Sequence, residues 1–211
     1  MKISMINGSQ KTGESNTEII IERLKSLINQ SNEIYIFNCG LKQLTNEMLN
    51  KIISTDAIIL IFPLFVHSLP SNTLKMLIEL ESVIKHQQKN DLIIYTIVNN
   101  GFYEGKQSNI AFEIIKNWCE HTGVKFGGGI GQGAGEMLGR TKHLPKDKDL
   151  FKNLSCTLQI MAENIEIKKP MEIKYLHPNF PRFLWRFMAV RNWNNMAKNN
   201  GLNKKDILKK L

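Results

Sequence analysis

The chain has 211 residues, of which 42% are hydrophobic, and its formal net charge is +9 at pH 7. This size suits one domain with a full hydrophobic core and a short appendage. The apolar runs are too short for a signal peptide or a membrane span of roughly 20 residues, so we expect a soluble, cytoplasmic protein. The three cysteines, Cys39, Cys119 and Cys156, lie far apart and lack metal-ligand spacing, so we expect reduced thiols and neither a zinc nor an iron–sulfur site.

Apolar runs alternate with helical patterns along the first three quarters of the chain. Strands are expected at residues 3–6, 34–37, 57–62, 92–98 and 124–130. Helices are expected after each strand, at about residues 19–28, 44–53, 72–84, 110–118 and 150–165. Nearly continuous apolar strands that alternate with helices indicate a parallel sheet covered on both faces. Five such units predict a three-layer α/β fold of the flavodoxin-like type, with a five-stranded parallel sheet in the order 2-1-3-4-5.

The first expected strand runs into a loop suited to an anion. Residues 7–17 read Asn-Gly-Ser-Gln-Lys-Thr-Gly-Glu-Ser-Asn-Thr, and a helix follows. Gly8 and Gly13 let the backbone approach a ligand, and the helix adds N–H groups at its positive end. Neither a Walker A loop nor G-x-G-x-x-G is present, so the phosphate need not belong to ATP or a dinucleotide. The alternative is that Ser15 and its neighbours only cap the helix and that Gly13 only permits a turn.

Two more loops are expected at the same edge, because ligands of doubly wound sheets lie beyond the carboxyl ends of the strands. After the third strand, residues 63–70 read Pro-Leu-Phe-Val-His-Ser-Leu-Pro, which is an unusually apolar turn. After the fourth, residues 99–104 read Asn-Asn-Gly-Phe-Tyr-Glu, which mixes amides with aromatic rings. An anion site, an apolar ledge and an amide-rich wall together suit a flat, conjugated, phosphorylated ligand.

These three loops resemble the flavin-binding loops of the flavodoxin-like NAD(P)H-dependent FMN reductases, over about residues 1–165. The resemblance implies that the FMN phosphate is held in the first loop by Ser9, Gln10, Lys11, Ser15, Asn16 and Thr17. It implies that the isoalloxazine is lined by Pro63, Leu64, Phe65 and Val66. It further implies that Asn99, Asn100, Gly101, Phe102 and Tyr103 border the pyrimidine edge of the isoalloxazine and the opening above the ring. The family commonly has arginine near the position of Lys11 and tyrosine at that of Phe65.

The function implied by the resemblance is that of an FMN-dependent oxidoreductase. It takes a hydride from NADPH or NADH and reduces a quinone, a flavin or another small acceptor. The flavin supplies the redox chemistry, so no catalytic acid–base pair is expected. Two alternatives are a non-enzymatic flavodoxin-type electron carrier, although such carriers are usually acidic, and a flavin-binding protein that docks to a membrane surface. We expect a homodimer and no nucleic-acid partner.

Two other features have competing interpretations. The string Gly129-x-Gly131-x-x-Ala134 matches a dinucleotide fingerprint, but no strand is expected after it, so we favour a flexible glycine loop near the cofactor. His67 could donate a proton to a reduced substrate, although a loop histidine is more often only solvated. Cys119 follows Trp118 on the apolar side of its helix and is expected in the core.

The positive charge belongs to the end of the chain. Residues 168–211 hold eleven Lys or Arg against two acidic residues, a net charge of +9, whereas residues 1–167 sum to zero. Prolines interrupt this segment before residues 180–193, where aromatic side chains alternate with arginines. We therefore expect a flavodoxin-like domain at 1–167 and a helical extension at 168–211. The extension is expected to pack on the domain or on a partner subunit, with its arginines reaching outward, and the alternatives are an anionic membrane surface or nucleic acid.

Overall fold

A computed structural model describes the whole chain except residues 12, 41, 88–90, 142–148, 204–205 and 207–211. The chain divides into two compact units, Met1–Pro178 and Asn179–Leu211, and each is described by itself. The boundary expected from the sequence, between residues 167 and 168, lies before the one observed, and residues 168–178 belong to the first unit.

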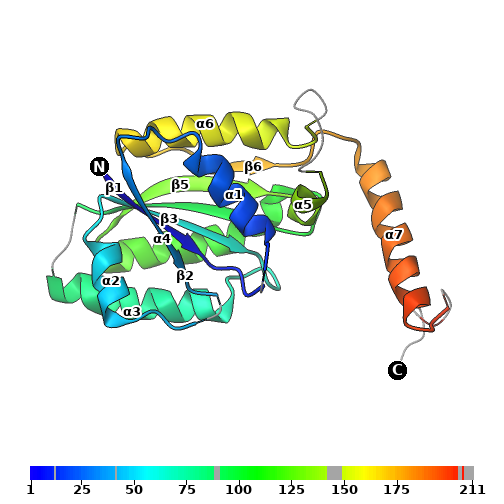
Figure 1. Cartoon of the computed structure of the whole chain (residues 1–211), viewed down its shortest axis with the longest axis horizontal. Helices are drawn as coiled ribbons and strands as arrows, with labels where there is room; N and C mark the ends of the chain where they lie inside the picture. Colours follow the sequence, from blue (N-terminus) through cyan, green and yellow to red (C-terminus); the bar gives the residue numbers. More distant parts are fainter. Residues whose placement is uncertain (12, 41, 88–90, 142–148, 204–205, 207–211) are drawn as a thin grey trace. The chain divides into compact units, whose positions relative to one another are not determined.

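The first unit is a parallel six-stranded sheet with the order β2-β1-β3-β4-β5-β6, covered by helices on both faces (Figure 1). Its strands are β1 (Lys2–Asn7), β2 (Glu33–Asn38), β3 (Ala57–Pro63), β4 (Ile93–Asn99), β5 (Lys125–Gln132) and β6 (Lys174–Leu176). Its helices are α1 (Asn16–Lys25), α2 (Asn46–Ile53), α3 (Ser71–Gln87), α4 (Asn109–Thr122), α5 (Leu138–Thr141) and α6 (Lys152–Glu166), with 3₁₀ turns η1 (Gly105–Ser108) and η2 (Gly135–Met137). In Figure 1, α1 and α6 lie on one side of the sheet, and α2, α3 and α4 lie on the other.

The expectation of five strands was wrong, because β6 adds a sixth to the edge next to β5. It pairs through three residues only, with Lys174 opposite Ile130 and Leu176 opposite Gln132. A strand of three residues between Pro170 and Pro178 is too short for a recognisable alternation of apolar and polar side chains. The expectation that no strand follows the glycine-rich segment was therefore also wrong.

The hydrophobic core lies on both faces of the sheet. The two central strands β3 and β4 are buried along nearly their whole length, which is typical of parallel strands with helices on both sides. On one face, Leu60 and Phe62 of β3 pack in a cluster with Met76 of α3 and Phe112 of α4. On the other, the Tyr95 hydroxyl of β4 lies within hydrogen-bond distance of two carbonyl oxygens, those of Asn164 in α6 and Lys169 beyond it, and can donate its proton to either.

The second unit contains α7 (Arg182–Asn199), so the expected helical extension is confirmed for these residues, whereas Lys174–Leu176 of the same segment form strand β6. The helix follows Pro181, whose extended backbone serves as its N-cap, and it ends at Asn200. None of its side chains is buried. Among the helices that the structure describes, none has the length and apolar character needed to cross a bilayer.

Candidate functional site

The loop after β1 is folded by its own side chains. The Ser9 N–H donates to Asn7 Oδ1 at 2.9 Å, and the Lys11 N–H donates to Ser9 Oγ at 3.3 Å. Gly8 is needed for packing, since a Cβ at that position would lie 2.5 Å from Thr73 Oγ1 and 2.7 Å from Phe62 Cβ. This glycine therefore lets the loop pack against β3 and α3.

The loop ends in a well-formed N-cap. Ser15 Oγ accepts a hydrogen bond from the Glu18 N–H, and the Glu18 carboxylate accepts one from the Ser15 N–H, which makes a capping box. Asn16 Oδ1 accepts a hydrogen bond from the Gly139 N–H, and Thr17 is buried. The capping role proposed as the alternative for Ser15 is therefore real. It does not exclude an anion, because the N–H groups of Asn16 and Thr17 still have no partner within the helix.

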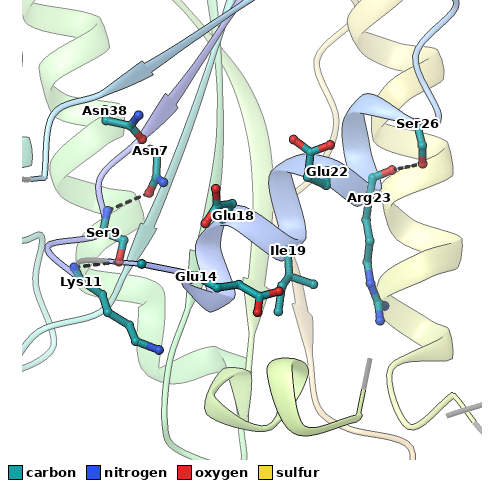
Figure 2. A pocket seen from close by; sticks show the side chains of 11 residues that line it. Asn7, Ser9, Lys11, Glu14, Glu18, Ile19, Glu22, Arg23, Ser26 and Asn38 are labelled. Atoms are coloured by element: carbon teal, nitrogen blue, oxygen red, sulfur yellow. Dashed lines mark hydrogen bonds between the residues drawn. The ribbon is translucent and has the colours of Figure 1, made fainter. Parts of the chain in front are cut away.

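A groove of about 870 Å³ runs from this loop along α1 (Figure 2). It is lined by Asn7, Ser9, Lys11, Gly13, Glu14, Glu18, Ile19, Glu22, Arg23, Ser26 and Asn38. Three of these side chains are carboxylates. Arg23 is directed to Asp149, 3.6 Å away, which leaves Lys11 as the exposed cation of the loop. An anion at this loop would therefore depend chiefly on backbone N–H groups.

The loop after β3 forms a tight turn with an exposed apolar tip. Phe65 and Ser68 exchange both backbone hydrogen bonds, at 2.9 and 2.8 Å, and the two residues between them have positive φ, +47° at Val66 and +63° at His67. Such turns usually hold Asn-Gly, and a β-branched residue is strained there. Val66 is nonetheless 96% exposed, and Phe65 is 45% exposed. Strained residues of this kind cluster at functional sites.

The loop after β4 lies against that turn. The Leu64 N–H donates to the Asn99 carbonyl oxygen at 2.9 Å, and the His67 ring stacks on Phe102 with 5.2 Å between centroids. Asn100 is committed to the loop itself, because its Nδ2 donates to Ser108 Oγ and its Oδ1 accepts from the Phe102 N–H. The two loops expected to contact a ring system are therefore in direct contact with each other.

The remaining predicted residues differ in how far they are exposed. Gly101 and Phe102 are exposed, whereas Tyr103 is half-buried and stacks on His177 with 5.4 Å between ring centroids. Gln10 and Pro63 are both half-buried, and Pro63 stands beside Asn99 in the sheet register. The loops after β1, β3 and β4 follow neighbouring strands, so the structure brings the three groups of predicted residues to one edge of the sheet.

Two buried amide oxygens at this edge have no hydrogen-bond partner among the described residues. They are Asn99 Oδ1, at the end of β4, and Gln132 Oε1, at the end of β5. The two residues are opposite each other in the strand register, so their side chains leave the same face of the sheet. Buried acceptors normally receive a hydrogen bond, so these oxygens call for an N–H or O–H donor. Gln132 was not predicted, and its only signal was a single amide at the end of a strand of glycine and apolar residues.

The interpretation of Gly129 and Gly131 as a loop was wrong, because both lie inside β5. A Cβ on Gly129 would lie 2.2 Å from the Thr96 carbonyl oxygen, so this glycine permits a close approach of β5 to β4. Neither glycine can form the turn that a dinucleotide fingerprint requires. Cys119 is buried, as expected for a core residue.

Comparison of the sequence with models of protein families and with curated proteins gives no match. Solved structures do match. A flavodoxin from Streptococcus pneumoniae TIGR4 superimposes with a TM-score of 0.55 at 11% identity, over 80% of this chain and 99% of that one. An FMN-dependent NADH-azoreductase from Bacillus anthracis gives a TM-score of 0.52 at 13% identity, over 78% of this chain and 99% of that one. The chain has the flavodoxin-like fold.

The flavodoxin-like fold confirms the expected resemblance at the level of architecture. The Trp repressor binding protein from Bacillus subtilis also matches, with a TM-score of 0.50 at 14% identity, over 61% of this chain and 85% of that one. Carriers and reductases both occur among these neighbours with similar scores, so the flavodoxin-like fold by itself does not separate an electron carrier from an enzyme.

Proposed function

We propose that this protein is an FMN-dependent oxidoreductase that accepts a hydride from NADH or NADPH and reduces a quinone, a flavin or another small acceptor. The observation that supports it best is the exposed, strained turn at Val66 and His67. It lies in contact with Phe102 at the same sheet edge as the N-terminus of α1. An apolar ledge beside an anion site fits a planar ring joined to a phosphate.

The residues present fit FMN at each end of the molecule. The first turn of α1 provides backbone N–H groups for the phosphate, and Ser9 and Ser15 retain hydroxyl protons that can be donated. Phe65 and Phe102 offer exposed aromatic surface to the ring, being 45% and 43% exposed. The buried acceptors of Asn99 and Gln132 could take an N–H of a heterocycle.

The bound flavin would supply the electron transfer, and the protein would position the ring and its phosphate. Phe65 and Val66 would exclude water from one side of the ring. His67 stacks on Phe102 and is exposed, so it could also give a proton to a reduced acceptor. The backbone of the first turn of α1 would hold the phosphate dianion through charge-assisted hydrogen bonds.

The second candidate is a flavodoxin-type carrier. Residues 1–178 have a net charge of +2, whereas a carrier that meets basic partners is usually acidic, and this difference favours the enzyme. We also propose a cytoplasmic homodimer, as the sequence suggested.

Rapid mixing of the FMN-loaded protein with NADH and with NADPH tests the proposal. We expect loss of flavin absorbance with at least one of them, followed by reoxidation when a quinone or free flavin is added. A flavin that binds but is reduced by neither nucleotide would favour the carrier. A protein that binds no flavin would contradict both.

A further inference from the structure

Helix α7 belongs to a unit with an unusual charge. Residues 179–211 hold eight Lys or Arg and a single acidic residue, Asp206, which gives a net charge of +7. No acidic residue occurs between Glu172 and Asp206. The positive charge of the whole protein is therefore concentrated on one helix and the residues that follow it.

One face of α7 carries three apolar side chains between cations, and further exposed apolar residues, Leu184, Met188 and Met196, lie on its other faces. Phe183, Phe187 and Val190 follow the four- and three-residue spacing that places side chains on one face of a helix. At about 100° per residue, Arg186 lies roughly 70° to one side of this stripe and Arg191 roughly 70° to the other. Arginines thus flank an aromatic stripe on both sides.

Nothing in the described part of the second unit covers this stripe. Phe183 is 74% exposed and Phe187 is 62% exposed. The described part of the unit contains one helix and its flanking turns, and a single helix cannot bury its own apolar face. Exposed aromatic surface of this kind marks a contact site.

We propose that α7 docks on an anionic lipid surface, lying in the plane of the headgroups. Phe183, Phe187 and Val190 would enter the boundary between headgroups and acyl chains. Arg186 and Arg191, one on each side, would extend to lipid phosphates while their aliphatic stems remain among apolar groups. The helix is not apolar enough to cross the bilayer, which agrees with a surface position.

Charge decides between lipid and the other occupants. Two copies of this unit would bring together two net charges of +7, which repel each other at moderate salt. A nucleic acid would satisfy the arginines but would leave the phenylalanine stripe in water. An anionic membrane surface complements both the cations and the stripe.

Sedimentation of the full-length protein with vesicles tests this proposal. We expect binding to vesicles of phosphatidylglycerol and phosphatidylcholine and about twentyfold or weaker binding to vesicles of phosphatidylcholine alone. Raising the salt to about 0.5 M should release much of the bound protein. Replacing both arginines, R186E/R191E, should reduce the affinity at least 25-fold, since each cation at such a surface contributes about fivefold.

Two more variants separate the effect of total charge from that of the apolar side chains of α7. K116E/K152E changes the total charge equally but at exposed lysines of the first unit, and it should bind vesicles nearly as well as the natural protein. F183S/F187S keeps every charge and should lose most of the vesicle binding. Its melting temperature and its mass in solution should stay unchanged.

Three results would overturn the proposal. A full-length protein that stays in the supernatant with anionic vesicles at low salt would do so. A fall in melting temperature or a change in mass for F183S/F187S would instead indicate that α7 packs on the first unit or on a second copy. Tight binding of the natural protein to duplex DNA or RNA, together with no binding to anionic vesicles, would identify a nucleic-acid site. None of these measurements depends on flavin.

Discussion

The Gly139 N–H donates a hydrogen bond of 2.9 Å to Asn16 Oδ1, which ties the first turn of α1 to the start of α5. The oxygen of Asn16 is thereby committed to the fold. Its Nδ2 group keeps the donor role that a phosphate needs. The proposed binding of a phosphate at this loop would consequently rest on N–H and O–H groups at the N-terminus of α1.

A preference for FMN over riboflavin follows from this arrangement. The two ligands differ only in the phosphate, and two charge-assisted hydrogen bonds to it contribute about 1.5–3 kcal/mol each. We expect FMN to bind at least a hundredfold more tightly in titration calorimetry. Equal affinities would contradict a phosphate site at α1.

Replacing Ser15 and Asn16 with alanine should weaken FMN binding by roughly 2–4 kcal/mol, because donors to the phosphate are lost. The variant also loses the N-cap of α1, which costs about 1 kcal/mol of stability. Thr45→Ala is the matched control, since Thr45 Oγ1 caps α2 in the same way by accepting from the Met48 N–H. The control should lose similar stability and keep its affinity for FMN. Unchanged FMN affinity in the folded double variant would remove these residues from the site.

A charge on the apolar ledge should act on the ligand more than on the fold. Phe65 is 45% exposed, so Phe65→Asp should shift the melting temperature by only a few degrees while lowering the affinity for FMN at least tenfold. Ile160→Asp introduces the same charge on α6, at a residue that is 51% exposed, and serves as the control. Equal effects of the two variants on FMN binding, measured by fluorescence titration, would argue against the ledge.

The unpartnered oxygens of Asn99 and Gln132 lead to a prediction about how the protein binds the flavin ring. The oxidised flavin ring has one N–H group, at N3. We expect this group to donate a hydrogen bond to one of the two oxygens. The natural protein should bind FMN about tenfold more tightly than N3-methyl-FMN, because methylation leaves a buried acceptor without a donor. In Gln132→Leu the difference should shrink. If the natural protein binds both ligands equally, the N3–H group does not pair with these oxygens.

The thiols should differ sharply in reactivity. Burial raises the pKa of Cys39 to about 11 and that of Cys119 to about 12, from about 9. Cys156 is exposed. We expect one thiol to react quickly with an aromatic disulfide reagent at pH 8 and the other two only after unfolding, with Cys156→Ser removing the fast reaction.

The same pKa shifts predict a loss of stability in alkali. A thiol whose pKa is raised in the folded state stabilises the fold fully below its unfolded pKa, and this contribution is lost as the pH rises through the folded value. The free energy of unfolding should therefore decline above about pH 9 and continue to fall toward pH 11–12, less steeply in Cys39→Ala. A flat profile between pH 8 and 11 would contradict the burial of both thiols.

The amino-acid sequence by itself determined the order of the five strands β1 to β5 and of the five longer helices that follow them, the helical character of α7, and the three loops at one edge of the sheet. Long apolar runs and helical spacing are local signals, and the carboxyl ends of parallel strands must meet at the same edge. Strand β6 escaped prediction, because three residues that pair only with β5 have no local pattern.

Only the tertiary structure decided which groups of the loops are committed to the fold. Two of these relationships join residues far apart in the chain: the packing of Gly8 against Phe62 and the pairing of Asn99 with Gln132. A third, the hydrogen bonds of Asn100, depends on the direction that a turn gives to its side chain. The positive φ of Val66 likewise depends on the hydrogen bonds that close its turn, because an isolated valine avoids that conformation. Local residue patterns predict each helix and strand separately. The register of the strands and the packing of the side chains depend on residues that come together only in the folded chain.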